Sequence, residues 1–208
     1  MLTFTLLGST VMSYNDVPLT QFRSQKELAL FVYLAHTEAT YQREFIADLL
    51  WESSSTKQAL SNLRTILARM RKQLGEHVFD LTRKTIALNF EYSQRADSTV
   101  FLQDIADIRE VNSAEAAQEL QQLLKRYKGE FCHNFYLKDG HNFNQWLTQT
   151  QEQIRREVAY GYEKLAYFAA SQQDPQLGIE VAHGWLEVDD FNEAAHISLV
   201  RNLIDAGN

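Results

Sequence analysis

The segment KQALSNLRTILARMRKQL, residues 57–74, combines five Lys and Arg residues with no Asp or Glu, in a chain whose formal net charge is −7. The same segment holds amide and hydroxyl side chains at Gln58, Ser61, Asn62 and Thr65. Guanidinium, ammonium and hydroxyl groups bind phosphate oxygens, and amides form paired hydrogen bonds with purine edges. These residue types in one carboxylate-free run are suited to recognising duplex DNA.

Apolar residues at every third or fourth position predict that this segment is an amphipathic helix from about Thr56 to Leu74, ended by Gly75. The predicted apolar stripe consists of Leu60, Leu63, Leu67, Met70 and Leu74. With the apolar stripe centred on Leu67 and Leu74, the opposite face presents Gln58, Ser61, Asn62, Thr65, Arg69 and Lys72. We expect these side chains to reach base edges and phosphates. The shoulder of the helix holds Lys57, Arg64 and Arg71, which reach either backbone phosphates or neighbouring acids such as Glu44 and Asp48.

The elements around this helix have the order of a winged helix-turn-helix. The first twenty residues alternate apolar and polar side chains, which predicts two or three short antiparallel strands. A capping box at Ser24 and Glu27 predicts a helix to about His36, and REFIADLLW predicts a second, short helix. Two β-like runs, 77–82 and 85–88, follow the basic helix and place Arg83 and Lys84 at a hairpin tip. Such a tip can lie beside the DNA backbone.

The second half is predicted to be all α, with helices near 97–108, 113–127, 143–172, 174–188 and 191–206. Asp174 followed by Pro175 reads as a helix start, and Asp190 as the cap of the last helix. Short links between these helices predict stacked antiparallel pairs of the tetratricopeptide type. We therefore predict an α+β winged helix-turn-helix domain over residues 1–92, followed by an all-α domain over residues 93–208.

Charge is divided unevenly between the two halves. Residues 1–90 hold ten Lys and Arg against eight Asp and Glu, whereas residues 91–208 hold ten against nineteen. An acidic surface repels DNA, so the second half is better suited to contacts with proteins. Its aromatic residues are explained most simply by packing between helices.

The whole chain resembles the SARP-type bacterial transcriptional activators. The run LTFTLLGSTVMSYNDVPLTQFRSQKELALFVYLA is similar to the opening of their OmpR-like winged-helix domain, and REFIADLLW with ALSNLRTILARMRKQLG is similar to the helix-turn-helix that follows. The stretches KRYKGEF and FNQWL, and the pattern from Glu193 to Gly207, resemble the bacterial transcriptional activation domain. Where that family tends to have Asp-Pro before the last helix, this chain has Asp190-Phe191.

The resemblance implies partners that the residues alone do not indicate. It implies a regulator of transcription, an activator, that contacts RNA polymerase and forms homodimers on direct repeats. Relatives are often followed by further modules, so we expect the chain to be the front part of a longer protein. The implied location is the bacterial cytoplasm, at the nucleoid when the protein is bound to DNA.

Other classes of function lack a motif. Cys132, His133 and His141 do not have the spacing of a zinc site, and no nucleotide-binding or esterase motif is present, so we expect neither a metal, a cofactor nor an enzyme. One cysteine fits a reducing compartment, and no apolar run predicts a membrane span or a signal peptide.

The leading hypothesis is a sequence-specific DNA-binding regulator that reads the major groove with helix 56–74 and the backbone or minor groove with the wing at residues 82–85. The alternative is a protein-interaction adaptor whose winged helix does not bind DNA. The predicted DNA-binding residues are Lys57, Gln58, Ser61, Asn62, Arg64, Thr65, Arg69, Arg71, Lys72, Arg83 and Lys84.

Overall fold

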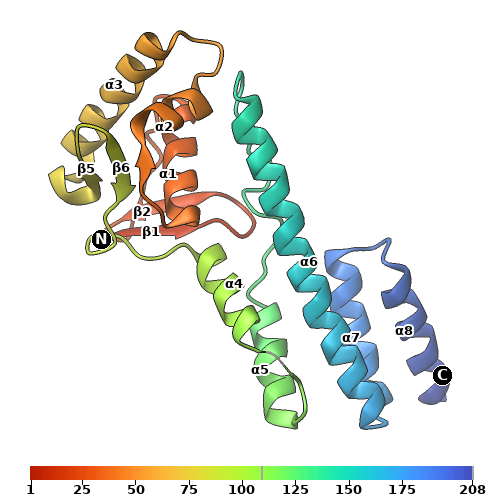
Figure 1. The fold of residues 1–208 in the computed structure, drawn as a ribbon. Coiled ribbons are helices and arrows are strands. Elements are labelled where there is room, and N and C mark those ends of the chain that lie inside the picture. Colours follow the sequence, from red (N-terminus) through yellow and green to blue (C-terminus); the bar gives the residue numbers. More distant parts are fainter. Residues whose placement is uncertain (109, 208) are drawn as a thin grey trace. The chain divides into compact units, whose positions relative to one another are not determined.

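A computed structural model describes residues 1–108 and 110–207 (Figure 1). Contacts between Cα atoms divide the chain into two compact units. The first unit comprises residues 1–100 and 131–150, and the second comprises residues 101–130 and 151–208. A winged helix-turn-helix is followed by an all-helical region, which confirms the predicted fold class. The domain boundary at residue 92 stays a prediction.

The chain opens with an antiparallel sheet of β1 (Leu2–Thr5), β2 (Val11–Tyr14) and β3 (Val17–Pro18), in that order. Alternation places Leu2 and Phe4 on the buried face of β1, whereas Thr5 is exposed. The turn between β2 and β3 uses Asn15 and Asp16 with φ of 49° and 64°, a conformation that Asn and Asp tolerate better than most residues. The predicted strands at the start of the chain are confirmed.

Helices α1 (Gln25–Thr37), α2 (Arg43–Leu50) and α3 (Thr56–Leu74) follow. Ser24 is the N-cap residue of α1 as predicted, but its side chain makes no capping hydrogen bond. Glu27 accepts a hydrogen bond from the Arg23 backbone N–H at 3.0 Å, one residue before the expected donor. The predicted capping box is therefore wrong in its chemistry, because the Glu27 carboxylate turns inward instead of back onto Ser24.

The wing is built from β5 (Phe79–Leu81) and β6 (Thr85–Leu88). The predicted hairpin is present, but residues 76–78 form a 3-10 helix (η1, Glu76–Val78) that shortens its first strand. The short strand β4 (Tyr41–Gln42) pairs with β6 on the other side, which gives the sheet order β4-β6-β5. The segment that leads into α2 is thus joined to the wing by backbone hydrogen bonds.

Two segments from the second half of the sequence pack within the first unit. The backbone N–H of Cys132 donates to the Leu6 carbonyl at 2.7 Å, which places residues 131–133 beside the end of β1. The Asp97 carboxylate accepts hydrogen bonds from the backbone N–H groups of Leu6 at 2.6 Å and Leu7 at 3.2 Å. The Trp146 ring lies 4.6 Å from that of Tyr33 in α1. These contacts make residues 131–150 part of the winged-helix core.

The remaining helices are α4 (Asp97–Asp107), α5 (Ala114–Leu124), α6 (His141–Ser171), α7 (Pro175–Val188) and α8 (Glu193–Asp205), labelled in Figure 1. α6 begins in the first unit and ends in the second. The Asp174 carboxylate accepts from the Leu177 N–H at 3.0 Å, which confirms the predicted start of α7. The predicted cap at Asp190 is wrong: Asn192 caps α8 by accepting from the Ala195 N–H at 3.0 Å.

Candidate nucleic-acid interface

Helix α3 begins and ends as its sequence predicts. The Ser55 hydroxyl accepts a hydrogen bond from the Gln58 backbone N–H at 3.3 Å, which satisfies one of the free donors of the first turn. Gly75 ends the helix with a φ of 105°, which most side chains would not adopt. The buried stripe consists of Ala59, Leu63, Ile66, Leu67, Met70 and Leu74.

This buried stripe is rotated around the helix relative to the one that the sequence predicts. Ala59 and Ile66 are buried, whereas Leu60, which was expected in the stripe, is only half-buried. The outward face is rotated accordingly, so Lys57 and Arg64 are exposed and lie further from the buried stripe than predicted. The exposed members of the predicted set are Lys57, Gln58, Ser61, Arg64, Thr65 and Lys72, and the partly buried members are Asn62, Arg69 and Arg71.

Two of the amide side chains on α3 are already paired. Gln58 Nε2 donates to Asn62 Oδ1 at 2.9 Å, one turn along the helix. The bond leaves the Gln58 carbonyl oxygen as an acceptor and the Asn62 amide nitrogen as a donor. A little further on, the Thr65 hydroxyl donates to the Ser61 carbonyl at 3.0 Å, which fixes its rotamer and turns its methyl group away from that carbonyl.

Thr82 shapes the tip of the wing. Its hydroxyl oxygen accepts hydrogen bonds from the backbone N–H groups of Lys84 at 3.1 Å and Thr85 at 2.9 Å. The Thr82 and Thr85 hydroxyls are also hydrogen-bonded to each other at 2.6 Å. A turn without glycine is stabilised in this way, and it leaves the Arg83 and Lys84 side chains exposed.

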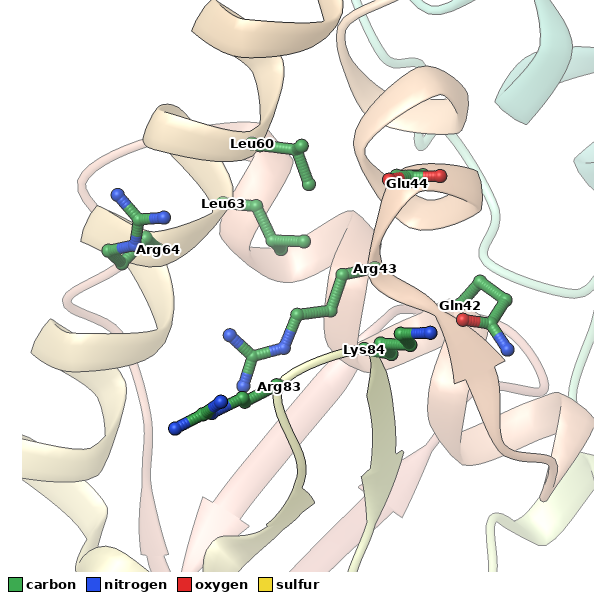
Figure 2. A pocket seen from close by; sticks show the side chains of 8 residues that line it. All are labelled: Gln42, Arg43, Glu44, Leu60, Leu63, Arg64, Arg83 and Lys84. Atoms are coloured by element: carbon green, nitrogen blue, oxygen red, sulfur yellow. The ribbon is translucent and has the colours of Figure 1, made fainter.

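Arg43, a residue that the sequence prediction missed, connects the wing to the start of α2. Its backbone N–H donates to the Lys84 carbonyl at 2.7 Å and its Nε donates to the Thr85 carbonyl at 3.3 Å. Figure 2 shows its side chain extending from the start of α2 toward Arg83, with Arg64 facing from α3. Burial lowers the pKa of Arg43, and the positive charges of Arg64 and Arg71 lower it further.

These cations border one groove of about 390 Å³, lined by Gln42, Arg43, Glu44, Leu60, Leu63, Arg64, Arg83 and Lys84. Leu60 and Leu63 point from α3 toward α2 and form its apolar wall (Figure 2). Four cations face a single acid in this lining, so the groove carries positive potential. The sequence did contain a signal for Arg43. A cation in the first turn of a helix interacts unfavourably with the helix dipole, so its presence there indicates a role other than stabilising the helix.

Two predicted phosphate ligands instead form ion pairs within the protein. Arg69 is paired with Glu27 of α1, a carboxylate that is only 2% exposed. Arg71 is paired with Glu76 of η1. Of the shoulder residues for which Glu44 and Asp48 were the alternative partners to phosphate, Arg71 pairs with Glu76 instead. The contacts of Arg69 and Arg71 with DNA stay a prediction.

Of the residues that were weighed for a metal or thiol site, Cys132 is buried, whereas His133 and His141 are exposed. Burial raises the pKa of the Cys132 thiol to about 12, so the thiol stays protonated at neutral pH. Among residues 1–108 and 110–207, no group of three or more His, Cys, Asp or Glu is arranged to hold a metal ion. Within the same residues, none of the helices has both the length and the apolar character needed to cross a membrane.

Comparisons with known proteins identify the fold. No protein-family model matches the sequence, and no curated protein is significantly similar to it. The solved structure of Mycobacterium tuberculosis EmbR in complex with a low-affinity phosphopeptide matches with a TM-score of 0.70 at 16% sequence identity. The match covers 99% of this chain and 55% of the EmbR chain, so this chain spans about half the length of EmbR.

The similarity extends over both the winged helix and the helices that follow it, so the two-part fold implied by the resemblance to the SARP-type activators is present. At this level of sequence identity the match establishes the fold.

Proposed function

We propose that this chain is a transcriptional regulator of the SARP type that binds duplex DNA with α3 in the major groove and the wing on the backbone. One observation carries the proposal: the outward face of α3 bears cations and hydrogen-bonding groups without a carboxylate. This face continues into the groove where Arg43, Arg83 and Lys84 gather. A helix fits the major groove, and cations beside it neutralise phosphates.

The paired amides of α3 suggest which base is read. With Gln58 Nε2 bonded to Asn62 Oδ1, the atoms without a side-chain partner in this pair are the Gln58 carbonyl oxygen, an acceptor, and the Asn62 amide nitrogen, a donor. Adenine presents the complementary pair in the major groove, an N6 donor and an N7 acceptor. We therefore expect the binding site to contain adenine opposite the first half of α3.

The same proposal covers the partners that the family resemblance implies. The protein activates transcription, contacts RNA polymerase, and binds direct repeats as a homodimer in the bacterial cytoplasm, at the nucleoid. The acidic balance of residues 91–208, nineteen Asp and Glu against ten Lys and Arg, supports a protein partner for the helical region. Exposed apolar side chains on α8, Ile197, Val200 and Ile204, are of the kind found in protein contacts.

DNA binding is tested by a mobility shift with random genomic fragments at low salt, followed by a titration with KCl. The variant Arg64→Ala/Lys84→Ala removes two exposed cations. We expect the negative slope of log K against log salt to become shallower by roughly 1.8, at about 0.9 per phosphate contact. The matched control is Arg126→Ala, because Arg126 is an exposed cation of the second unit paired with Asp104 at 2.6 Å. Its slope is expected to equal that of the wild type.

Selection of bound fragments from a random DNA pool then reports sequence preference and repeat spacing. Asn62→Ala is expected to relax the preference at an adenine while leaving the salt slope unchanged, because Asn62 carries no charge. Equal loss of affinity on every sequence would show that Asn62 only positions the helix. No shift of any fragment at low salt would contradict the proposal and favour the protein-interaction adaptor.

A further inference from the structure

A second group of cations lies beside the C-terminal half of α3. A surface depression of about 480 Å³ is lined there by Gln21, Phe22, Arg23, Arg69, Lys72 and Gln73. All six lining residues belong to the described part of the chain, and they comprise three cations, two amides and no carboxylate. This lining suits an anion with several acceptor oxygens.

A buried carboxylate supports this depression from below. One oxygen of Glu27 accepts the backbone N–H of Arg23 at 3.0 Å, and the other is paired with the Arg69 guanidinium. Glu27 therefore fixes the backbone at Arg23 and the position of Arg69 together. Because the charge of Arg69 is already balanced, the cations left for a ligand are Arg23 and Lys72, both exposed.

Electrostatic repulsion between Arg23 and Arg69 also favours the binding of an anion. Burial lowers the pKa of Arg69, and the neighbouring positive charge of Arg23 lowers it further. Two cations close enough to affect each other in this way are stabilised when a negative charge lies between them. Among the described residues, Arg23 and Lys72 form no ion pair that would supply this charge.

The position of the depression on the helix matches the geometry of DNA. At 3.6 residues per turn, Arg64 and Arg69 point about 140° apart around α3, with Ser61, Thr65, Ala68 and Lys72 on the outward face between them. Lys72 points about 80° from Arg64 and about 60° from Arg69, so it lies on the Arg69 side of this face. The major groove is about 12 Å wide and has a phosphate strand on each side.

We propose that Arg23 and Lys72 form a second phosphate site, which binds the DNA strand on the opposite side of the major groove from the strand held by Arg43, Arg83 and Lys84. In this site Arg69 is a positioning residue, held by Glu27. The inference rests on the proposed DNA binding and adds to it a residue outside α3 and the wing. α3 is then clamped between phosphates of both strands.

The first test is a salt titration on a duplex obtained from the random pool. Arg23→Ala/Lys72→Ala is expected to reduce the slope of log K against log salt by about 1.8, whereas Arg126→Ala leaves it unchanged. Arg23→Lys keeps the charge and is expected to retain the wild-type slope. Both substituted residues are exposed, and circular dichroism checks that each variant is folded.

Phosphate ethylation interference on the same duplex separates the two strands. In the wild type, ethylation is expected to interfere on both strands; Arg23→Ala/Lys72→Ala loses the signal on one strand, and Arg83→Ala/Lys84→Ala loses it on the other. If only the wing variant changes the slope and the pattern, the second site is wrong and the proposed function stands. If the wild type binds no duplex, both proposals fail.

Discussion

The buried His36 makes the stability of the first unit depend on pH, and the size of this effect can be calculated. Its imidazole Nδ1 lies 2.9 Å from the Ser98 hydroxyl oxygen, and its ring centre is 4.7 Å from that of Phe131 and 6.0 Å from that of Trp146. These partners come from α4 and from residues 131–150, so His36 joins α1 to the segments that complete the first unit. Burial lowers the pKa of His36 from 6.5 to about 4, and the ring is neutral in the folded protein at pH 7.

The sign of the effect follows from the two pKa values. The unfolded chain takes up a proton on His36 as the pH falls below about 6.5, whereas the folded chain does so only near pH 4. Protonation therefore stabilises the unfolded state throughout this window, and the contribution of His36 is complete above pH 6.5. At about 1.4 kcal/mol for each unit of pKa difference, the unfolding free energy falls by roughly 3 kcal/mol between pH 6.5 and pH 4.

Urea unfolding at pH 7, 6, 5 and 4.5 measures this loss. Fluorescence of Trp51 and Trp146, both in the first unit, is the probe, in a Trp185→Phe background that removes the tryptophan of the second unit. The comparison is with His36→Gln, which keeps a polar partner for Ser98 but has no proton to gain. Carboxylates titrate in both proteins, so the difference between the two pH profiles isolates His36. Identical losses of unfolding free energy between pH 6.5 and 4.5 would refute the reasoning.

Two further predictions concern carboxylates that organise the first unit. Arg69→Ala leaves the buried Glu27 carboxylate without its cation, and we expect the unfolding free energy measured by chemical denaturation to fall by about 2 kcal/mol. This loss is below the ~3–5 kcal/mol of fully buried pairs because the Arg69 side chain is 28% exposed. An equal loss for Lys72→Ala would contradict this prediction. Glu52 accepts the backbone N–H groups of His141 at 2.5 Å and Asn142 at 3.2 Å, so Glu52→Ala should cost about 1 kcal/mol and speed hydrogen exchange at these two amides. Unchanged exchange there would show that the cap does not stabilise α6.

Prediction from sequence succeeded where the signal was local. The strands of the first sheet, the helices near their predicted bounds, the α7 cap at Asp174 and the end of α3 at Gly75 all depend on residues within a few positions of each other. The prediction was wrong where two side chains of similar chemistry compete for the same role. Asp190 and Asn192 can both cap a helix, and the choice of Asn192 depends on how the chain turns after α7, where the Asn192 backbone N–H donates to the Asp189 carbonyl at 3.1 Å.

The centre of the α3 stripe shows a second limit. The large apolar residues alone define one direction for the centre of the stripe; they are Leu60, Leu63, Leu67, Met70 and Leu74. The outward face deduced from that direction placed Arg64 on the shoulder. Burial of the small residue Ala59 shifts the centre of the stripe, because α3 packs closely on the rest of the first unit at that position. The size of a side chain is a poor guide to its burial when the neighbouring element is unknown.

The sequence by itself determined that the chain carries a carboxylate-free amphipathic helix followed by a basic hairpin, because helical periodicity and the absence of acids are properties of adjacent residues. Only the tertiary structure decided which cations remain available. Glu27 pairs with Arg69, forty-two positions later, and the carbonyls of Lys84 and Thr85 hold Arg43 from across a sheet. Such pairings depend on the packing of distant segments, and ion pairing is decided by distances of a few ångströms that no local pattern encodes.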